Sequence, residues 1–192
     1  ALQTIVSRET KPGTPAVVTV GTIQGGTKRN IISESVKLEL TLRAFEDKVM
    51  QDMIAAIRRI CDGTARAAGV PEDRLPVVTV TPESTPVTVN DAALTQRLTR
   101  TFKAWLGERR VEPAPPTTGG EDFSEFGRTL HRVPIFIWGV GAADPAKYAA
   151  AARRGESLPS NHSPLALFVP DPTLQTCVTT MTAAVLDLAA KK

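Results

Sequence analysis

The chain has 192 residues, of which 42% are hydrophobic and 22% charged, and 23 Lys and Arg oppose 20 Asp and Glu. This is an ordinary globular composition, and the chain is long enough for one large domain or two small ones, so we do not expect intrinsic disorder. Aromatic residues make up only 5% and no dense basic run occurs, which argues against nucleic-acid binding. No apolar run approaches the roughly 18 residues of a membrane span, so we expect no membrane partner.

The first residues, ALQTIVSR, contain neither an initiator Met nor the basic and apolar regions of a signal peptide. Leu2, Ile5 and Val6 are spaced as on one face of a helix, and Pro12 with Gly13 ends it. We therefore expect the last turns of a helix whose beginning is missing, which is a first indication that the chain is a fragment.

A hairpin and a helix are predicted next. Residues 16–23 alternate, 24–30 are turn-rich and 36–45 alternate again, which favours two antiparallel strands with one polar face. The apolar face of the second strand is formed by Val36, Leu38, Leu40 and Leu42. Residues 46–68 carry the apolar stripe of a helix, made of Val49, Met53, Ala56, Ile57 and Ile60. A strand region at 75–80 and 86–89 completes most of a ferredoxin-like two-layer α+β domain.

The second half is expected to supply αβα parts of a parallel α/β domain. A helix follows the cap Asn90-Asp91 and ends at Gly107, residues 121–126 start a short helix, and 133–140 form a fully buried strand. Asp171 is expected to cap the last helix. Its core-facing residues are predicted to be Leu174, Val178, Met181, Val185 and Leu188. We interpret Cys61 and Cys177 as buried, unpaired thiols of a reducing compartment.

Several residues could carry chemistry, each beside a simpler interpretation. His131 is expected to be a surface residue. His162 lies in a stiff loop between prolines, which suits a metal ligand or an acid–base group and equally a solvated histidine. In Thr117–Phe123, two glycines allow close approach of a ligand, while Glu121 and Asp122 are acid–base candidates or helix-start carboxylates. The loop 24–30 and Arg43 are, taken alone, a hairpin turn and a surface charge.

Taken together, these segments resemble the aminoacylase-like metallopeptidases, which include hippurate hydrolases, N-acyl-amino-acid deacylases and plant auxin-conjugate hydrolases. The runs VVTVGTIQGGTKRNII, VKLELTLRAF, GGEDF and NHSP carry the resemblance, in order and over essentially the whole chain. It implies a lid, or dimerisation, domain at residues 1–85 that is N-terminally incomplete, and the C-terminal portion of the catalytic domain at 86–192.

The resemblance also implies the function. Such enzymes hydrolyse the amide bond of N-acyl amino acids with two divalent metals (Zn, Mn, Ni or Co) that activate a water. It makes His162 the final metal ligand, Gly119 and Gly120 a substrate-side wall, and Asn30 and Arg43 lid residues that reach the substrate. No catalytic residue is expected within the chain itself. A cytoplasmic homodimer through the lid, acting on a small-molecule substrate, is the implied assembly.

This sequence departs from the family pattern at four places, one of which is Asn30-Ile-Ile-Ser33-Glu34, where the family commonly has Asn-Ile-Ile-Pro-Asp. The family's other metal-binding motifs and its Glu-Glu pair are not in the chain, Gln24 stands where many relatives carry His, and residues 147–156 resemble an inserted helix. We therefore expect the isolated chain to be inactive. The alternative is a dimerisation or binding module without catalysis.

Overall fold

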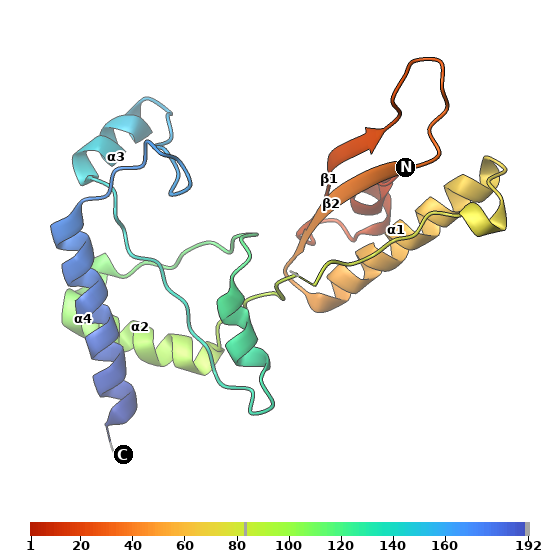
Figure 1. The fold of residues 1–192 in the computed structure, drawn as a ribbon. Coiled ribbons are helices and arrows are strands. Elements are labelled where there is room, and N and C mark those ends of the chain that lie inside the picture. The colour runs from red at the N-terminus through yellow and green to blue at the C-terminus, as the bar shows by residue number, and fades with distance from the viewer. Residues whose placement is uncertain (83, 191–192) are drawn as a thin grey trace. The chain divides into compact units, whose positions relative to one another are not determined.

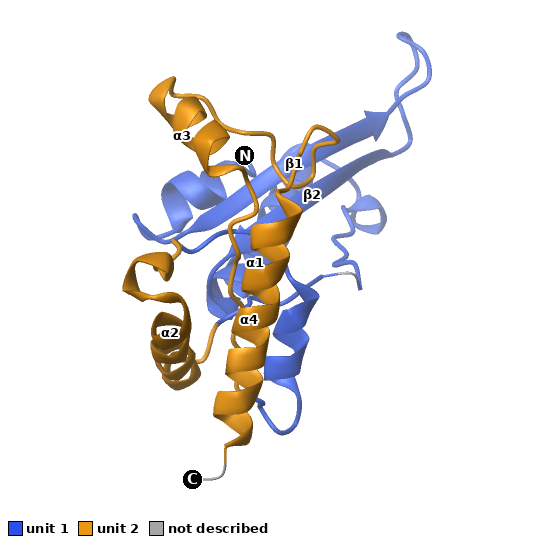
Figure 2. Ribbon diagram, turned by 90° about the vertical axis from the view of Figure 1, so that its left-hand side faces the viewer, with its two compact units in different colours: residues 1–89, 116–133 blue, residues 90–115, 134–192 orange. Residues whose placement is uncertain are grey.

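The computed structural model describes residues 1–82 and 84–190, and the chain forms two compact units. Unit 1 contains residues 1–89 and 116–133, and unit 2 contains residues 90–115 and 134–192 (Figure 2). The elements are one two-stranded antiparallel sheet and a set of helices (Figure 1). The predicted mixed α/β class is confirmed. The predicted boundary at residues 85 and 86 stays a prediction.

Unit 1 is built on the expected hairpin. Strand β1 (Ala16–Gly25) pairs with β2 (Val36–Ala44), from Ala16 opposite Ala44 to Gly25 opposite Val36. The register shifts between Val20 and Thr22, so Gly21 is an extra residue, a β-bulge.

The bulge changes which side chains of β1 share a face. Because it intervenes, Ile23 lies opposite Leu38, just as Val20 lies opposite Leu40. Directly opposed residues of an antiparallel pair share a face. The apolar face therefore continues along the whole hairpin.

Helix α1 (Asp47–Ala67) packs on this face together with the π-helical turn η1 (Ile5–Glu9). The buried residues of this core come from all three elements: Ile5, Val18, Met53, Ala56 and Ile57. The predicted stripe of α1 and the predicted helical turn near the N-terminus are thus confirmed. Further along the hairpin the face is uncovered, since Ile23 is 69% exposed, Val36 57% and Leu38 42%.

Unit 2 is held by two crossing helices, α2 (Ala92–Leu106) and α4 (Pro170–Ala189). Their buried contact residues are Leu98, Phe102, Ala183 and Ala184, with Phe136 and Trp138 packed against them. Arg97 donates from Nε to Asp187 Oδ2 at 2.6 Å and also donates to the Asp187 carbonyl. The predicted start and end of α2 are confirmed, since Asp91 accepts from the Leu94 amide and Gly107 follows the helix.

The short elements complete both units. Unit 1 also contains η2 (Glu72–Arg74) and η4 (Asp122–Arg128), which are 3-10 turns. Unit 2 also contains η3 (Glu108–Arg110) and α3 (Pro145–Arg153), a helix that overlaps the one expected at 147–156. None of the described helices is long and apolar enough to cross a membrane.

The predicted inner face of α4 is wrong. Leu174, Val178, Met181, Val185 and Leu188 are each about half or more exposed. The buried positions are Thr180, Ala183 and Ala184, which lie on the neighbouring stripe, since successive helical residues are about 100° apart. Small residues let α4 approach α2 closely, and the larger apolar stripe is left uncovered among the described residues. Helix α4 also begins earlier than predicted, at Pro170, with Val169 rather than Asp171 before it.

The predicted strand region at 75–80 and 86–89 and the predicted strand at 133–140 are also wrong. These residues form no regular secondary structure and have no ladder partner within residues 1–82 and 84–190. Only Ile135 of the 133–140 run is buried. The side chain of Asn90 makes the hydrogen bonds that a neighbouring strand would make at Ile137. Its Nδ2 donates to the Ile137 carbonyl and its Oδ1 accepts from the Ile137 backbone amide, both at 2.8 Å. Both cysteines are free, as predicted, but Cys177 is exposed and Cys61 only half-buried.

Candidate functional site

The glycine loop of the predicted site lies against the hairpin end that α1 covers. Arg43, near the end of β2, donates from Nη1 to the Thr118 carbonyl at 2.6 Å. Gly119 and Gly120 follow directly and are exposed. A Cβ at Gly120 would lie 2.7 Å from Thr85 Oγ1, so a larger residue there would require the Thr85 side chain or the loop to shift. The structure thus brings Arg43 together with Gly119 and Gly120.

Asn30 lies elsewhere on the hairpin. It belongs to the exposed loop that joins β1 to β2, beyond the pair Gly25 and Val36. Arg43 pairs with Val17 near the other end. At about 3.3 Å per residue, the strand length from Val36 to Arg43 is roughly 23 Å. Within one chain, Asn30 and Arg43 therefore do not reach the same group of a small ligand.

The acidic residues after the glycines are solvent-exposed. Glu121 precedes η4, and Asp122 is its first residue. The Glu121 carbonyl accepts from Thr88 Oγ1 at 3.3 Å and from the Ser124 amide at 3.1 Å. Ser124 itself is 1% exposed, and its Oγ has no hydrogen-bond partner among the described residues.

An ion pair closes η4 against α1. Arg128 donates from Nη1 to Asp47 Oδ2 at 2.7 Å and from Nη2 to Asp47 Oδ1 at 2.8 Å, and Nη2 lies 3.4 Å from the Val87 carbonyl. The hydrogen bonds from Arg128 lower the pKa of Asp47, against a smaller effect of burial. The same bonds raise the pKa of Arg128. The sequence interpretation missed both residues, which are 81 positions apart.

The two histidines are both exposed. His162 lies in unit 2, in a loop closed by turns in which the Ser163 amide donates to the Ser160 carbonyl at 2.9 Å and the Ala166 amide to the Ser163 carbonyl at 3.0 Å. Through residues 1–82 and 84–190, no group of three or more His, Cys, Asp and Glu is placed to hold a metal ion. His162 alone does not make a catalytic metal site, which needs about three protein ligands.

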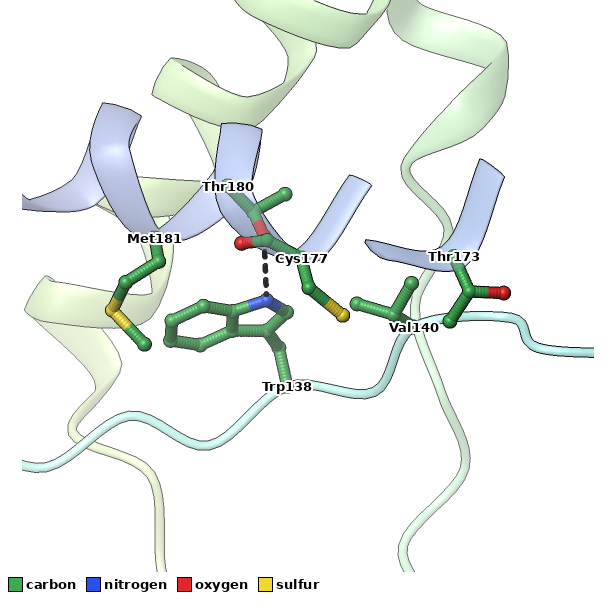
Figure 3. A pocket seen from close by; sticks show the side chains of 6 residues that line it. All are labelled: Trp138, Val140, Thr173, Cys177, Thr180 and Met181. Carbon is green, nitrogen blue, oxygen red and sulfur yellow. Dashed lines mark hydrogen bonds between the residues drawn. The ribbon is translucent and has the colours of Figure 1, made fainter. Parts of the chain in front are cut away.

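A shallow apolar pocket lies between the 133–140 segment and α4 in unit 2. Figure 3 shows the indole of Trp138 under α4, with Met181 on one side and Cys177 and Val140 on the other. Trp138 Nε1 donates to Thr180 Oγ1 at 3.3 Å. The pocket lining contains no histidine and no carboxylate, so the acid–base groups of hydrolysis are not found there.

The family model described as Peptidase family M20/M25/M40 matches residues 5–157. An N-acetyldiaminopimelate deacetylase of Limosilactobacillus fermentum is 29% identical over 153 residues, which cover 76% of this chain and 36% of the relative. The IAA-amino acid hydrolase ILR1-like 2 of Arabidopsis thaliana is 33% identical over 138 residues, covering 68% of this chain and 29% of that protein.

One solved structure is similar over nearly the whole chain. It is described as an aminohydrolase from methicillin-resistant Staphylococcus aureus, with a TM-score of 0.73 and 25% identity, and the match covers 99% of this chain and 44% of that one. The chain thus spans about a third of the length of the curated relatives it matches.

Proposed function

Because the chain belongs to peptidase family M20/M25/M40, we propose that it is part of a metal-dependent amidohydrolase that cleaves the amide bond of N-acyl amino acids. The main support is the family match together with relatives named as a deacetylase of N-acetyldiaminopimelate and a hydrolase of IAA-amino acids. In this proposal residues 1–85 form the lid, and residues 86–192 contribute to the catalytic domain.

The chain's own residues would bind substrate rather than perform the chemistry. The Arg43 guanidinium is a fork suited to a carboxylate, and it lies next to the Gly119-Gly120 loop through its bond to Thr118. Asn30 would act at a different place, since it lies at the far end of the hairpin. We propose that Asn30 serves the site of a second copy.

The described residues, 1–82 and 84–190, contain no cluster that could hold the metals. His162 would be one ligand, and the others would have to come from polypeptide outside residues 1–192. Two divalent metals in the intact enzyme, their identity and a cytoplasmic location stay predictions.

A segment-swap chimera tests the function. The residues aligned with the Bacillus subtilis N-acetyldiaminopimelate deacetylase, which is 34% identical over 147 residues, would replace that relative's own segment. We expect the chimera to release acetate from an N-acetylated amino acid, and the 192-residue chain alone to release none and to bind Zn²⁺ weakly. A folded, metal-loaded chimera without activity would contradict the proposal.

The lid is also proposed to form a two-fold dimer. The uncovered apolar face at Ile23, Val36 and Leu38 and the open edges of a two-stranded sheet favour pairing with another copy. Light scattering should give a molar mass twice that of one chain. Leu38→Lys should lower this mass toward that of the monomer, while Thr41→Lys, on the other face of β2, should leave it unchanged. A monomer at high concentration would contradict the dimer. A dimer whose chimera is inactive would instead favour the non-catalytic dimerisation module.

A further inference from the structure

The Gly119-Gly120 loop is hydrogen-bonded to other parts of unit 1 on both sides of the glycines. Before them, Thr118 accepts from Arg43 of β2. After them, Glu121 accepts from Thr88. Thr85 lies close to where a Cβ at Gly120 would be, so the two residues are close neighbours. The loop therefore follows the hairpin and the residues 85–88.

Arg128 makes the firmest of these attachments. Its guanidinium binds both oxygens of Asp47, the first residue of α1. A two-bond arginine–carboxylate pair fixes orientation as well as distance. The carboxylate also lies in the first helical turn, where negative charge is favoured.

We propose that Arg128 and Asp47 are positioning residues, whose ion pair holds η4, and with it the preceding Gly119-Gly120 loop, against α1. The proposal rests on the proposed function only in that Gly119 and Gly120 are taken to line the substrate site. The attachment itself is a property of the 192-residue chain and is measurable without catalysis.

The Asp47–Arg128 pair affects the position of the loop more than the free energy of unfolding of unit 1. The Arg128 side chain is 38% exposed and that of Asp47 58%, and neither residue belongs to the core of unit 1. Exposed pairs contribute little to global stability. In η4, Phe123 and Gly127 are half-buried and Ser124 is buried, so η4 has few inward-facing side chains and the ion pair is one of the contacts that hold it in place.

The buried Ser124 amide reports on this arrangement. It donates to the Glu121 carbonyl between the glycines and Arg128, so it exchanges with solvent only when η4 opens. Amide exchange measured by NMR on the full chain would compare Ser124 with Ile57, which is buried inside α1. Asp47→Asn removes the negative charge of the carboxylate, and Arg128→Lys removes the guanidinium that makes two hydrogen bonds. Asp52→Asn removes the exposed Lys48 pair on the same helix as a matched control.

We expect Ser124 to exchange about two- to fivefold faster in Asp47→Asn and Arg128→Lys, with Ile57 and the Asp52→Asn chain unchanged. On acidification, Ser124 exchange in the wild-type chain should approach that of Asp47→Asn measured at the same pH, with Arg128 and Glu125 the other charged groups involved. Unchanged Ser124 exchange in both variants would overturn the proposal, as would equal loss at Ser124 and Ile57. An inactive chimera would leave these results intact, so the two failures are distinguishable.

Discussion

Arg43 and Lys37 lie on the same exposed face of β2, and this makes them a matched pair. Arg43→Ala removes one exposed hydrogen bond and no core contact, so we expect the free energy of unfolding to fall by under about 1 kcal/mol. In the chimera, loss of a donor at the reacting groups should lower kcat/KM roughly 100-fold. Asn30→Ala should behave alike and Lys37→Ala should change neither quantity. Full activity of Arg43→Ala would show that Arg43 only holds the loop through Thr118 and does not contact the substrate.

The Asp47–Arg128 pair predicts a pH dependence. Because Arg128 lowers the pKa of Asp47 in the folded chain, the ionised pair stabilises the fold above the unfolded-state pKa and ceases to do so as the pH falls through the folded-state pKa. The Asp47 side chain is 58% exposed, so solvent screening keeps the contribution under about 1 kcal/mol.

Urea unfolding of the wild-type chain and Asp47→Asn measures this effect. The stability difference should be present at about pH 6 and should vanish well below the ordinary Asp pKa of about 3.9. A difference that grows on acidification would contradict the assigned direction.

Two buried hydroxyls predict opposite responses. Ser124 Oγ has no partner in the described part of the chain, so Ser124→Ala should leave stability unchanged or raise it by up to about 1 kcal/mol. Thr180 Oγ1 accepts from Trp138 Nε1 and donates to the Thr176 carbonyl at 2.8 Å. Thr180→Val keeps the shape and orphans the indole, which should cost about 1–3 kcal/mol. Thermal unfolding measures both, and equal effects would contradict the hydrogen-bond assignment.

Sequence patterns could identify some of these residues and not others. The glycines of 119–120 and Arg43 were found because they belong to local motifs. The contact of Arg43 with Thr118 and the pairing of Asp47 with Arg128 join positions 75 and 81 apart. No local periodicity links them, since each arginine alone has the signature of a surface charge. The roles of Asn30, Gly119, Gly120 and His162 stay predictions.

At the scale of elements, helix α4 predicts a contrast between its two stripes. Val178 is 66% exposed and Ala183 is 1% exposed against α2. Val178→Lys should therefore change the free energy of unfolding by about 0.5 kcal/mol or less, whereas Ala183→Leu should cost about 1–3 kcal/mol through overpacking. Chemical unfolding of the two variants decides which face is inside. A larger loss of stability in Val178→Lys than in Ala183→Leu would show that the large apolar residues of α4 form its buried face.

Element types were largely predictable, and the faces of elements less so. The hairpin, α1 and α2 were predicted because each buries one apolar face within its own unit. On α4 the strongest apolar stripe is the outer one, because small residues rather than large ones make the contact with α2. The 133–140 run has the composition of a buried strand, yet strand formation requires ladder partners, and Asn90 provides only two hydrogen bonds.

At the scale of the whole chain, the two cores predict two separable unfolding transitions. The core of unit 1 contains Met53 and that of unit 2 contains Leu98, 1% and 2% exposed respectively. Truncating either to Ala should cost about 2–5 kcal/mol. Both tryptophans, Trp105 and Trp138, belong to unit 2, so their fluorescence follows that unit alone.

We therefore expect Leu98→Ala to lower the midpoint of the fluorescence transition and Met53→Ala to leave it in place. Far-UV circular dichroism, which records helices of both units, should respond to both substitutions. A fluorescence midpoint that moves equally in the two variants would show that the chain unfolds as one cooperative body.

Because Gly21 is an extra residue in β1, the hairpin can change its length at this position without changing its strand pairing. A methyl group there would meet only the Glu39 carbonyl oxygen at 3.7 Å, an ordinary contact. Deleting Gly21 would join Val20 and Thr22 in an unbroken ladder with every apolar pair preserved. Deleting Thr19 instead would turn one neighbouring valine toward water. We therefore expect the hairpin to tolerate a deletion at position 21 and to be destabilised by a deletion two residues earlier.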